Sequence, residues 1–261
     1  MSRFEKEIEF SKKLARAAGE IMKKYFKSHE VKFKADNTPV TIADETINKL
    51  VLDEIGLAFP GDGIFAEEGS DYDGQSRTWV VDPIDGTVPY TYGLPLSFFS
   101  LGFVVDGRVQ FGVCYRPFDD AMYFGDGQIA TKNDQAICVN GKNHLKDAVF
   151  SACFHNTEEY KDAYKAVSGL AEVARSSISL QCIVADAMLV AEGKIEIATY
   201  PHNHPYDIAG LKPIIEGAGG KVTDMNGIDQ PYDRDINGAI ITNGQLHDEV
   251  VSYFKKTMII I

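Results

Sequence analysis

Two segments near the start of the chain repeat apolar residues every three or four positions, which predicts two amphipathic helices. The first spans residues 4–27. The second follows a loop at 32–44 and ends near Pro60, because proline cannot continue a helix. The apolar stripes consist of Leu14, Ala18, Ile21 and Tyr25 in the first helix and of Ile47, Leu50, Val51 and Ile55 in the second.

Short runs of β-branched and aromatic residues follow, separated by turn residues, and they predict a strand-rich middle region. Asp106-Gly107 between two of these runs is typical of a hairpin turn. The predicted strands are 78–81, 98–105, 109–115 and 122–124.

The rest of the chain alternates between the two patterns, and it contains no internal repeat. Strands are predicted at 149–153, 195–200, 221–223 and 239–242, and helices at 158–170, 182–192, 206–218 and 245–256. Because the pattern changes after the turn at Asn140-Gly141, we place a boundary near Lys146 and expect two parts, 1–146 and 147–261.

The composition, with 44% hydrophobic and 25% charged residues, is typical of a globular protein and argues against disorder. The chain has 26 Lys and Arg against 38 Asp and Glu, a formal charge of −12. Such a charge repels nucleic acids and anionic membranes, so neither is an expected partner. An anionic small molecule stays possible, because carboxylates can hold divalent cations that reverse the local field.

The sequence does not suggest export or membrane insertion. No stretch is long and apolar enough to span a bilayer, and acids occupy the positions where a signal peptide would be basic and then apolar. We therefore expect a cytoplasmic protein. The four cysteines (Cys114, Cys138, Cys153 and Cys182) have no CxxC spacing, so we expect free buried thiols and no zinc site.

The stretch with the most chemical information is Asp82-Pro83-Ile84-Asp85-Gly86-Thr87, which follows a β-type run. Gly86 lets the backbone approach a ligand closely, and a helix beginning there would direct the amides of Gly86 and Thr87 at an anion. Two carboxylates and free amides suit phosphate-ester hydrolysis with bound Mg²⁺. A strand-ending turn in which the aspartates serve as caps is the alternative.

Other polar motifs have simple structural explanations when each is taken alone. Glu67-Glu68 is typical of a solvated pair, since like charges prefer water. Thr41 and Asp44 have the spacing of a helix-capping box, and Asp207 fits the first turn of a helix. His202 and His204 are expected to be surface-loop histidines. No single one of these motifs indicates a catalytic site.

In this order along the chain, however, the motifs resemble those of the inositol monophosphatase family. They are Thr41 with Asp44, Glu67-Glu68, Asp82 to Thr87, Tyr206 to Ala209, and Glu216 to Gly220. The resemblance implies an α+β fold, the layered αβαβα sandwich that the family shares with fructose-1,6-bisphosphatases. It also implies an enzyme that removes phosphate from small esters with Mg²⁺ and forms a homodimer.

The resemblance further implies roles for the residues at matching positions. A first metal ion would be held by Glu67, Asp82 and the Ile84 carbonyl, and a second by Asp82, Asp85 and Asp207. A third, more weakly bound ion would lie beside Glu67. Glu67 would contribute to catalysis through the ions that it binds, and Glu68 is a less certain neighbour of the site. Asp44 and Thr87 would orient the attacking water, and the Gly86 and Thr87 amides would hold the phosphate. Most ligands thus fall in 1–146, while 147–261 supplies Asp207 and the pocket wall.

The chain departs from the family pattern where the alcohol half of a substrate would bind. Counted back from Asp207 without gaps, the family's Gly-Thr-Ala segment falls on Gln181-Cys182-Ile183, and a ring-binding glutamate falls on Tyr200. Asp85, Asp207, Ile183 and Tyr200 are therefore the expected substrate contacts. An apolar side chain and a phenol do not replace an acid that binds ring hydroxyls, which puts inositol phosphate in doubt.

The expected substrate is a small phosphate monoester of the inositol 1-phosphate type. Histidinol phosphate, fructose bisphosphate and adenosine 3′,5′-bisphosphate are the alternatives within the same chemistry. A catalytically silent protein that kept the fold is the alternative from another class. The presence of all four acids that would hold metal (Glu67, Asp82, Asp85 and Asp207) argues against it.

Overall fold

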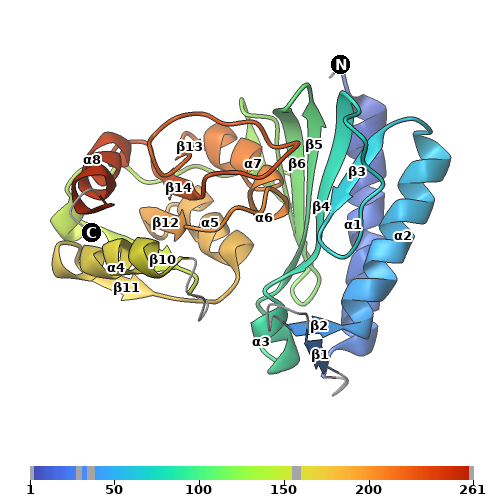
Figure 1. The fold of residues 1–261 in the computed structure, drawn as a ribbon, viewed down its shortest axis with the longest axis horizontal. Coiled ribbons are helices and arrows are strands. Elements are labelled where there is room, and N and C mark those ends of the chain that lie inside the picture. Colours follow the sequence, from blue (N-terminus) through green and yellow to red (C-terminus); the bar gives the residue numbers. More distant parts are fainter. Residues whose placement is uncertain (1–2, 28–30, 34–38, 155–159, 259–261) are drawn as a thin grey trace.

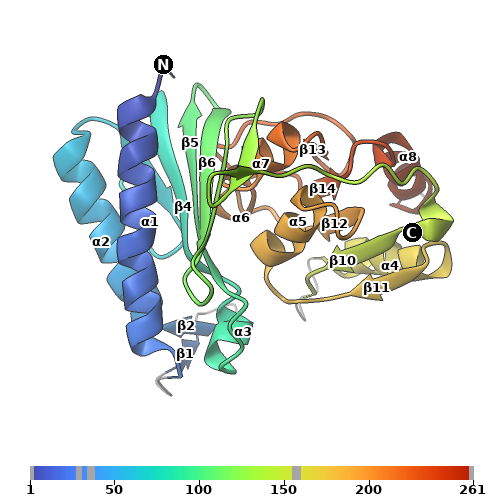
Figure 2. The same cartoon turned by 180° about the vertical axis from the view of Figure 1, so that it is seen from behind.

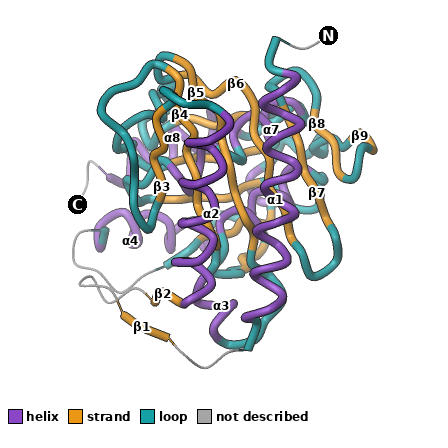
Figure 3. Tube along the Cα trace, turned by 90° about the vertical axis from the view of Figure 1, so that its right-hand side faces the viewer, coloured by secondary structure: helices purple, strands orange, loops and turns teal. Residues whose placement is uncertain are grey.

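The computed structural model describes residues 3–27, 31–33, 39–154 and 160–258 and arranges them in five layers (Figure 1). The outer layer on one side contains α1 (Glu5–Tyr25) and α2 (Ile42–Ala58), which lie side by side along a seven-stranded sheet (Figure 3). A middle layer of three helices separates this sheet from a five-stranded sheet, and α4 (Lys161–Gly169) and α8 (His247–Met258) cover the far side. The predicted αβαβα sandwich is confirmed.

The seven-stranded sheet has the order β3-β4-β5-β6-β7-β8-β9, and β3 and β4 are its only parallel pair. Its strands are β3 (Gly63–Ala66), β4 (Arg77–Asp85), β5 (Phe98–Val105), β6 (Arg108–Arg116), β7 (Ala121–Gly125), β8 (Ala130–Lys132) and β9 (Gln135–Ala136). The predicted hairpin at Asp106-Gly107 joins β5 to β6. The strand predicted at 78–81 is too short, because β4 continues through Asp82 and, after a register shift, pairs again at Asp85.

The five-stranded sheet has the order β11-β10-β12-β14-β13 and is parallel on the β11 side and antiparallel on the β13 side. Its strands are β10 (Val149–Ala152), β11 (Ser176–Ile178), β12 (Ile197–Tyr200), β13 (Lys221–Thr223) and β14 (Ala239–Thr242). The middle helices are α5 (Ile183–Ala191), α6 (Tyr206–Ala209) and α7 (Lys212–Gly217), so the single helix predicted at 206–218 is in fact two. One-turn helices η1 (Leu145–Asp147) and η2 (Leu170–Glu172) flank β10 and α4.

The segment between α1 and α2 is not the plain loop that the sequence predicts. Its described residues form an antiparallel pair, β1 (Val31–Phe33) and β2 (Pro39–Thr41), and residues 34–38 lie outside the described part of the chain. The start of the helix predicted at 158–170 also falls partly outside it, and α4 begins at Lys161. A short helix, α3 (Thr87–Thr91), follows β4.

Alternation along β4 places apolar side chains on both faces of the large sheet. Trp79 and Val81 belong to the core under α1 and α2, whereas Val80 belongs to the core between the two sheets. Burial of each such side chain contributes roughly 1.5–3 kcal/mol. By the same alternation Asp82 falls on the face toward α6, which carries Asp207.

A stripe of three glycines allows the middle helices to lie directly on the large sheet (Figure 2). Gly102, Gly112 and Gly125 are paired in register across β5, β6 and β7. A methyl group at Gly112 would lie 1.9 Å from the carbonyl oxygen of Gly210, which is far below van der Waals contact. The missing side chains therefore let α6 and α7 approach closely, and this brings Asp207 to the end of β4.

The structure also tests two expectations about the chain's environment. Within the described residues, no helix combines the length and apolar character needed to cross a membrane. All four cysteines are free, as predicted, and three of them are buried, but Cys138 is exposed.

Candidate metal centre

Three carboxylates from two elements meet at the centre of the molecule. Asp82 and Asp85 lie at the end of β4, and Asp207 lies in α6. One oxygen of each lies within 4.8 Å of one oxygen of the others. These are the three acids that, by the family resemblance, would hold the second metal ion.

The backbone between Asp82 and Thr87 holds these groups in place. The amide of Ile84 donates to Asp82 Oδ1 at 2.9 Å, and the hydroxyl of Thr87 donates to the carbonyl oxygen of Ile84 at 3.1 Å. Gly86 has a φ of +81°, which favours glycine, and it precedes α3 as the sequence predicts. A side chain at Gly86 would also lie 2.7 Å from Cys182 Cβ, so α5 packs tightly against this turn.

Burial and mutual repulsion make this site costly for negative charge. Burial, and next the charges of Glu67 and Asp207, raise the pKa of Asp82 well above its ordinary value. Burial raises the pKa of Asp85 to about 7. A divalent cation would remove this repulsion, and carboxylate oxygens are the ligands that Mg²⁺ prefers. The donor set therefore fits the metal that the family resemblance implies.

Asp44 is both a neighbour of the site and the third helical residue of the predicted capping box, whose N-cap is Thr41. Its Oδ2 accepts hydrogen bonds from the Thr41 amide at 2.8 Å and from the Thr41 hydroxyl at 2.6 Å, which confirms the capping box. Its Oδ1 is buried and has no hydrogen-bond partner in the described part of the chain. Burial raises the pKa of Asp44 to about 7, although the bonds from Thr41 lower it, and the charges of Glu67 and Glu68 raise it further.

Glu67 and Glu68 are partly buried, so the simple picture of a fully solvated pair is wrong. The amide of Glu67 donates to the carbonyl oxygen of Val81 at 3.3 Å, which places Glu67 beside the residue before Asp82. Glu67 is also the carboxylate that raises the pKa of Asp82 most strongly. The two glutamates therefore lie at the edge of the same acidic site.

Two neutral side chains outside the expected set of metal ligands donate hydrogen bonds to members of that set. The thiol of Cys182 lies 2.7 Å from Asp85 Oδ2, and the hydroxyl of Tyr200 donates to Asp207 Oδ2. Tyr200 is 4% exposed and Ile183 is 1% exposed, which leaves little of either side chain for a substrate to contact. The available sequence signal for Cys182 was its place directly before the apolar run of α5, where a helix cap is expected.

The two histidines beside Asp207 differ from the expectation of surface-loop residues. His202 is buried, its Nε2 lies 3.0 Å from the hydroxyl of Tyr164, and its ring packs against that of Tyr200. His204 is partly buried and stacks on the ring of Tyr206. The aromatic rings that line this segment give both histidines packing partners.

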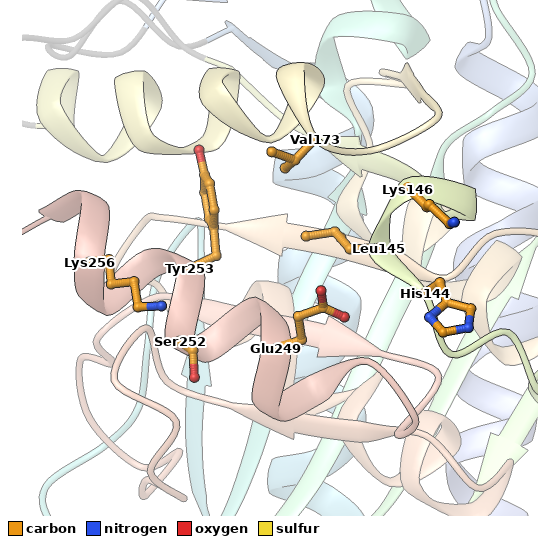
Figure 4. A pocket seen from close by; sticks show the side chains of 8 residues that line it. All are labelled: His144, Leu145, Lys146, Val173, Glu249, Ser252, Tyr253 and Lys256. Carbon is orange, nitrogen blue, oxygen red and sulfur yellow. The ribbon is translucent and has the colours of Figure 1, made fainter.

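A groove of about 430 Å³ lies elsewhere, between η1, η2 and α8 (Figure 4). Its lining residues are His144, Leu145, Lys146, Val173, Glu249, Ser252, Tyr253 and Lys256. Only one of these residues, Glu249, is an acid, so the groove lacks a set of converging carboxylates of the kind that favours a divalent cation. We therefore assign the candidate site to the carboxylate cluster.

Comparison with known proteins identifies the family that the motifs resemble, over nearly the whole chain. A model of the inositol monophosphatase family matches residues 4–258. The fructose-1,6-bisphosphatase/inositol-1-monophosphatase of Thermotoga maritima is 31% identical over 248 residues, 94% of each chain. The histidinol-phosphatase of Mycobacterium tuberculosis is 31% identical over 237 residues, 84% of this chain and 85% of that protein. Among solved structures, a Thermotoga maritima IMPase matches with a TM-score of 0.86 at 29% identity, covering 97% of this chain and 98% of the other.

Proposed function

The chain belongs to the inositol monophosphatase family, and from this premise we propose that it is a Mg²⁺-dependent enzyme whose central carboxylates hold the ions. That it is a phosphatase acting on small phosphate monoesters follows from the family and its named relatives. The observation that carries the metal proposal is the meeting of Asp82, Asp85 and Asp207 within 4.8 Å.

We assign the ligands by combining the resemblance with this geometry. Glu67, Asp82 and the Ile84 carbonyl would hold one ion, and Asp82, Asp85 and Asp207 a second, with a third, weaker ion beside Glu67. When bound, the ions would lower the pKa of a water molecule and neutralise charge on the leaving oxygen. The raised pKa of Asp85, caused by burial, supports this assignment because a cation would relieve the cost of its charge.

Asp44 and Thr87 would orient the water that attacks phosphorus. The buried Oδ1 of Asp44, which has no described hydrogen-bond partner, is a suitable acceptor for a water proton. The hydroxyl of Thr87 contacts the Ile84 carbonyl and so lies beside a proposed ligand. The amides of Gly86 and Thr87 would bind the phosphate oxygens, whose charge rearranges in the transition state.

We propose that the substrate is not a polyol that needs several charged partners. Asp85 and Asp207 would contact its alcohol half, with Ile183 and Tyr200 behind them. A site lacking an acid for ring hydroxyls loses about 1.5–3 kcal/mol per missing charged hydrogen bond, or roughly ten- to a hundredfold in specificity. Inositol 1-phosphate should therefore be hydrolysed more weakly than the best ester of a panel.

The decisive experiment measures phosphate release from inositol 1-phosphate, histidinol phosphate, fructose 1,6-bisphosphate and adenosine 3′,5′-bisphosphate while Mg²⁺ is titrated. We expect hydrolysis of at least one ester that disappears when Mg²⁺ is removed by a chelator. Calorimetry showing no Mg²⁺ binding at millimolar concentration would contradict the metal assignment. A strong preference for inositol 1-phosphate would contradict the substrate assignment.

Three further expectations remain predictions. They are the homodimer, the cytoplasmic location and the division into 1–146 and 147–261. The first can be measured by sedimentation, and the last by expressing the two parts separately.

A further inference from the structure

We propose that Cys182 is a positioning residue, whose thiol fixes Asp85 in the orientation that binds metal. The inference rests on the proposed function, because it takes Asp85 as a ligand. The thiol lies 2.7 Å from Asp85 Oδ2, and the amide of Val184 donates to the same oxygen at 2.8 Å. Two donors therefore hold one oxygen of the Asp85 carboxylate.

The direction of the bond follows from the chemistry of the two groups. An ionised carboxylate only accepts hydrogen bonds, and a thiol has a single hydrogen to donate. The hydrogen of Cys182 is therefore directed at Asp85, and the sulfur atom accepts from the Ala185 amide at 3.4 Å. Cys182 thereby connects the first turn of α5 to a carboxylate 97 residues earlier in the chain.

The backbone around Cys182 leaves this side chain little freedom. Gln181 before it has a φ of +55°, a conformation that non-glycine residues seldom adopt. Cys182 Cβ packs against Gly86, where a side chain would come within 2.7 Å, and its sulfur lies 3.4 Å from the Leu96 carbonyl oxygen. The Cys182 side chain therefore packs against the turn that contains the proposed phosphate-binding amides.

Removing the thiol should weaken the metal site without removing a ligand. Hydrogen bonds that orient a ligand typically contribute 10- to 100-fold to metal affinity or activity. We expect Cys182→Ala to weaken Mg²⁺ binding by about this factor, because one donor to Asp85 is lost. Cys182→Ser keeps a donor at the same position, so its loss of affinity should stay below the roughly tenfold lower end of that range.

Cys153 provides a matched control. It is a buried thiol that also donates to an aspartate, Asp186 Oδ2 at 3.5 Å, but Asp186 is not a proposed ligand. Cys153→Ala should leave the Mg²⁺ dissociation constant unchanged even if it lowers the melting temperature. Equal weakening by both alanine variants would mean general loosening of the core and would overturn the proposal.

The test measures the Mg²⁺ dissociation constant by calorimetry and the Mg²⁺-induced rise in melting temperature for all variants. If wild type binds Mg²⁺ and Cys182→Ala binds it equally well, Cys182 does not position Asp85. If wild type itself binds no Mg²⁺, the proposed function fails instead.

A second measurement keeps the proposal testable should Cys182→Ala fail to fold. The infrared S–H stretching band of Cys182, isolated by subtracting the Cys182→Ser spectrum, should shift when Mg²⁺ withdraws charge from Asp85. A band that Mg²⁺ leaves unchanged would contradict the proposal.

Discussion

Asp82 and Glu196 are both almost completely buried acids, but their surroundings differ in kind. Glu196 accepts hydrogen bonds from the Asn140 side chain at 2.7 Å and the Val149 amide at 2.6 Å, and it forms an ion pair with Lys142 at 2.9 Å. The groups that most affect the pKa of Asp82, after burial itself, are four other carboxylates.

This difference distinguishes an acid whose charge the fold itself compensates from an acid whose charge is compensated when a ligand binds. The donors around Glu196 compensate its charge within the fold, and they tie β10 and the segment before it to β12. The carboxylates around Asp82 repel one another, so the fold accepts a cost that is removed when a metal cation binds or when a carboxylate retains its proton. A buried acid is therefore informative about function only when its partners are known.

The largest expected effect concerns catalysis at the uncompensated site. Asp85→Asn removes a ligand charge but keeps the shape, so turnover should fall by about 10³-fold, or about 4 kcal/mol. The same change should raise the melting temperature of the metal-free protein, because one repelling charge is lost. Steady-state kinetics and thermal unfolding measure the two effects. A variant with unaltered turnover would remove Asp85 from the site.

The next effect is the pH dependence of the stability of the metal-free protein. Burial raises the pKa values of Asp44 and Asp85 to about 7, so the folded state retains protons that the unfolded chain has already lost above pH 4. Stability should therefore fall between about pH 4 and 7, by up to about 1.4 kcal/mol per pH unit for each group.

His247 acts in the opposite sense over part of this range. Burial lowers its pKa to about 4, so it adds stability as pH rises from about 4 to 6.5. Comparison of wild type with Asp85→Asn across this range isolates the contribution of Asp85. We expect the variant to have the shallower fall, and identical slopes would show that Asp85 does not titrate there.

Substitution of Glu196, the acid whose charge the fold compensates, should lower stability and leave activity in place. Glu196→Gln loses a charge that three donors bind, so the free energy of unfolding should fall by about 2–3 kcal/mol while Mg²⁺-dependent turnover is retained. Urea unfolding together with the phosphatase assay measures both. Loss of turnover in a fully folded variant would mean that the two regions are coupled.

The smallest effect distinguishes the adjacent glutamates at the edge of the site. Glu67→Gln should reduce turnover by about tenfold or more, because Glu67 acts directly on Asp82 and is a proposed ligand. Glu68→Gln should change it less, since Glu68 is the weaker influence on Asp44. Kinetics at several Mg²⁺ concentrations measure the ordering, and equal losses at both positions would contradict it.

Local signals in the sequence are sufficient to predict the long helices and strands. The capping box of Thr41 and Asp44 and the hairpin at Asp106-Gly107 depend on neighbours in the chain, so their spacing predicts them. Strands of two or three residues, such as β9 and β11, carry no periodic pattern and exist only because a partner strand pairs with them. The break between α6 and α7 has a local cause instead, because Pro213 in the first turn of α7 has no amide hydrogen for a helical bond to Ala209.

The residues of the site also divide into those that the sequence predicts and those that only the structure shows. Asp82, Asp85 and Asp207 could be selected because their motifs resemble those of a family, although their individual patterns also suited caps and turns. The donors behind them could not be selected, because the contact of Cys182 with Asp85 joins segments that no local pattern relates. Tyr200 departs from the family pattern in the sequence, but its bond to Asp207 depends on the three-dimensional fold.

The glycine stripe across β5, β6 and β7 has a consequence for the order of folding. Each strand contributes one glycine, so the surface on which α6 and α7 dock exists only after all three strands have paired in register. A slip by one residue would replace a glycine with a side chain and close that surface. Asp207 joins Asp82 and Asp85 only through this docking. In a refolding chain, metal affinity should therefore appear with the docking of α6 and α7 on the large sheet and not with the earlier pairing of strands.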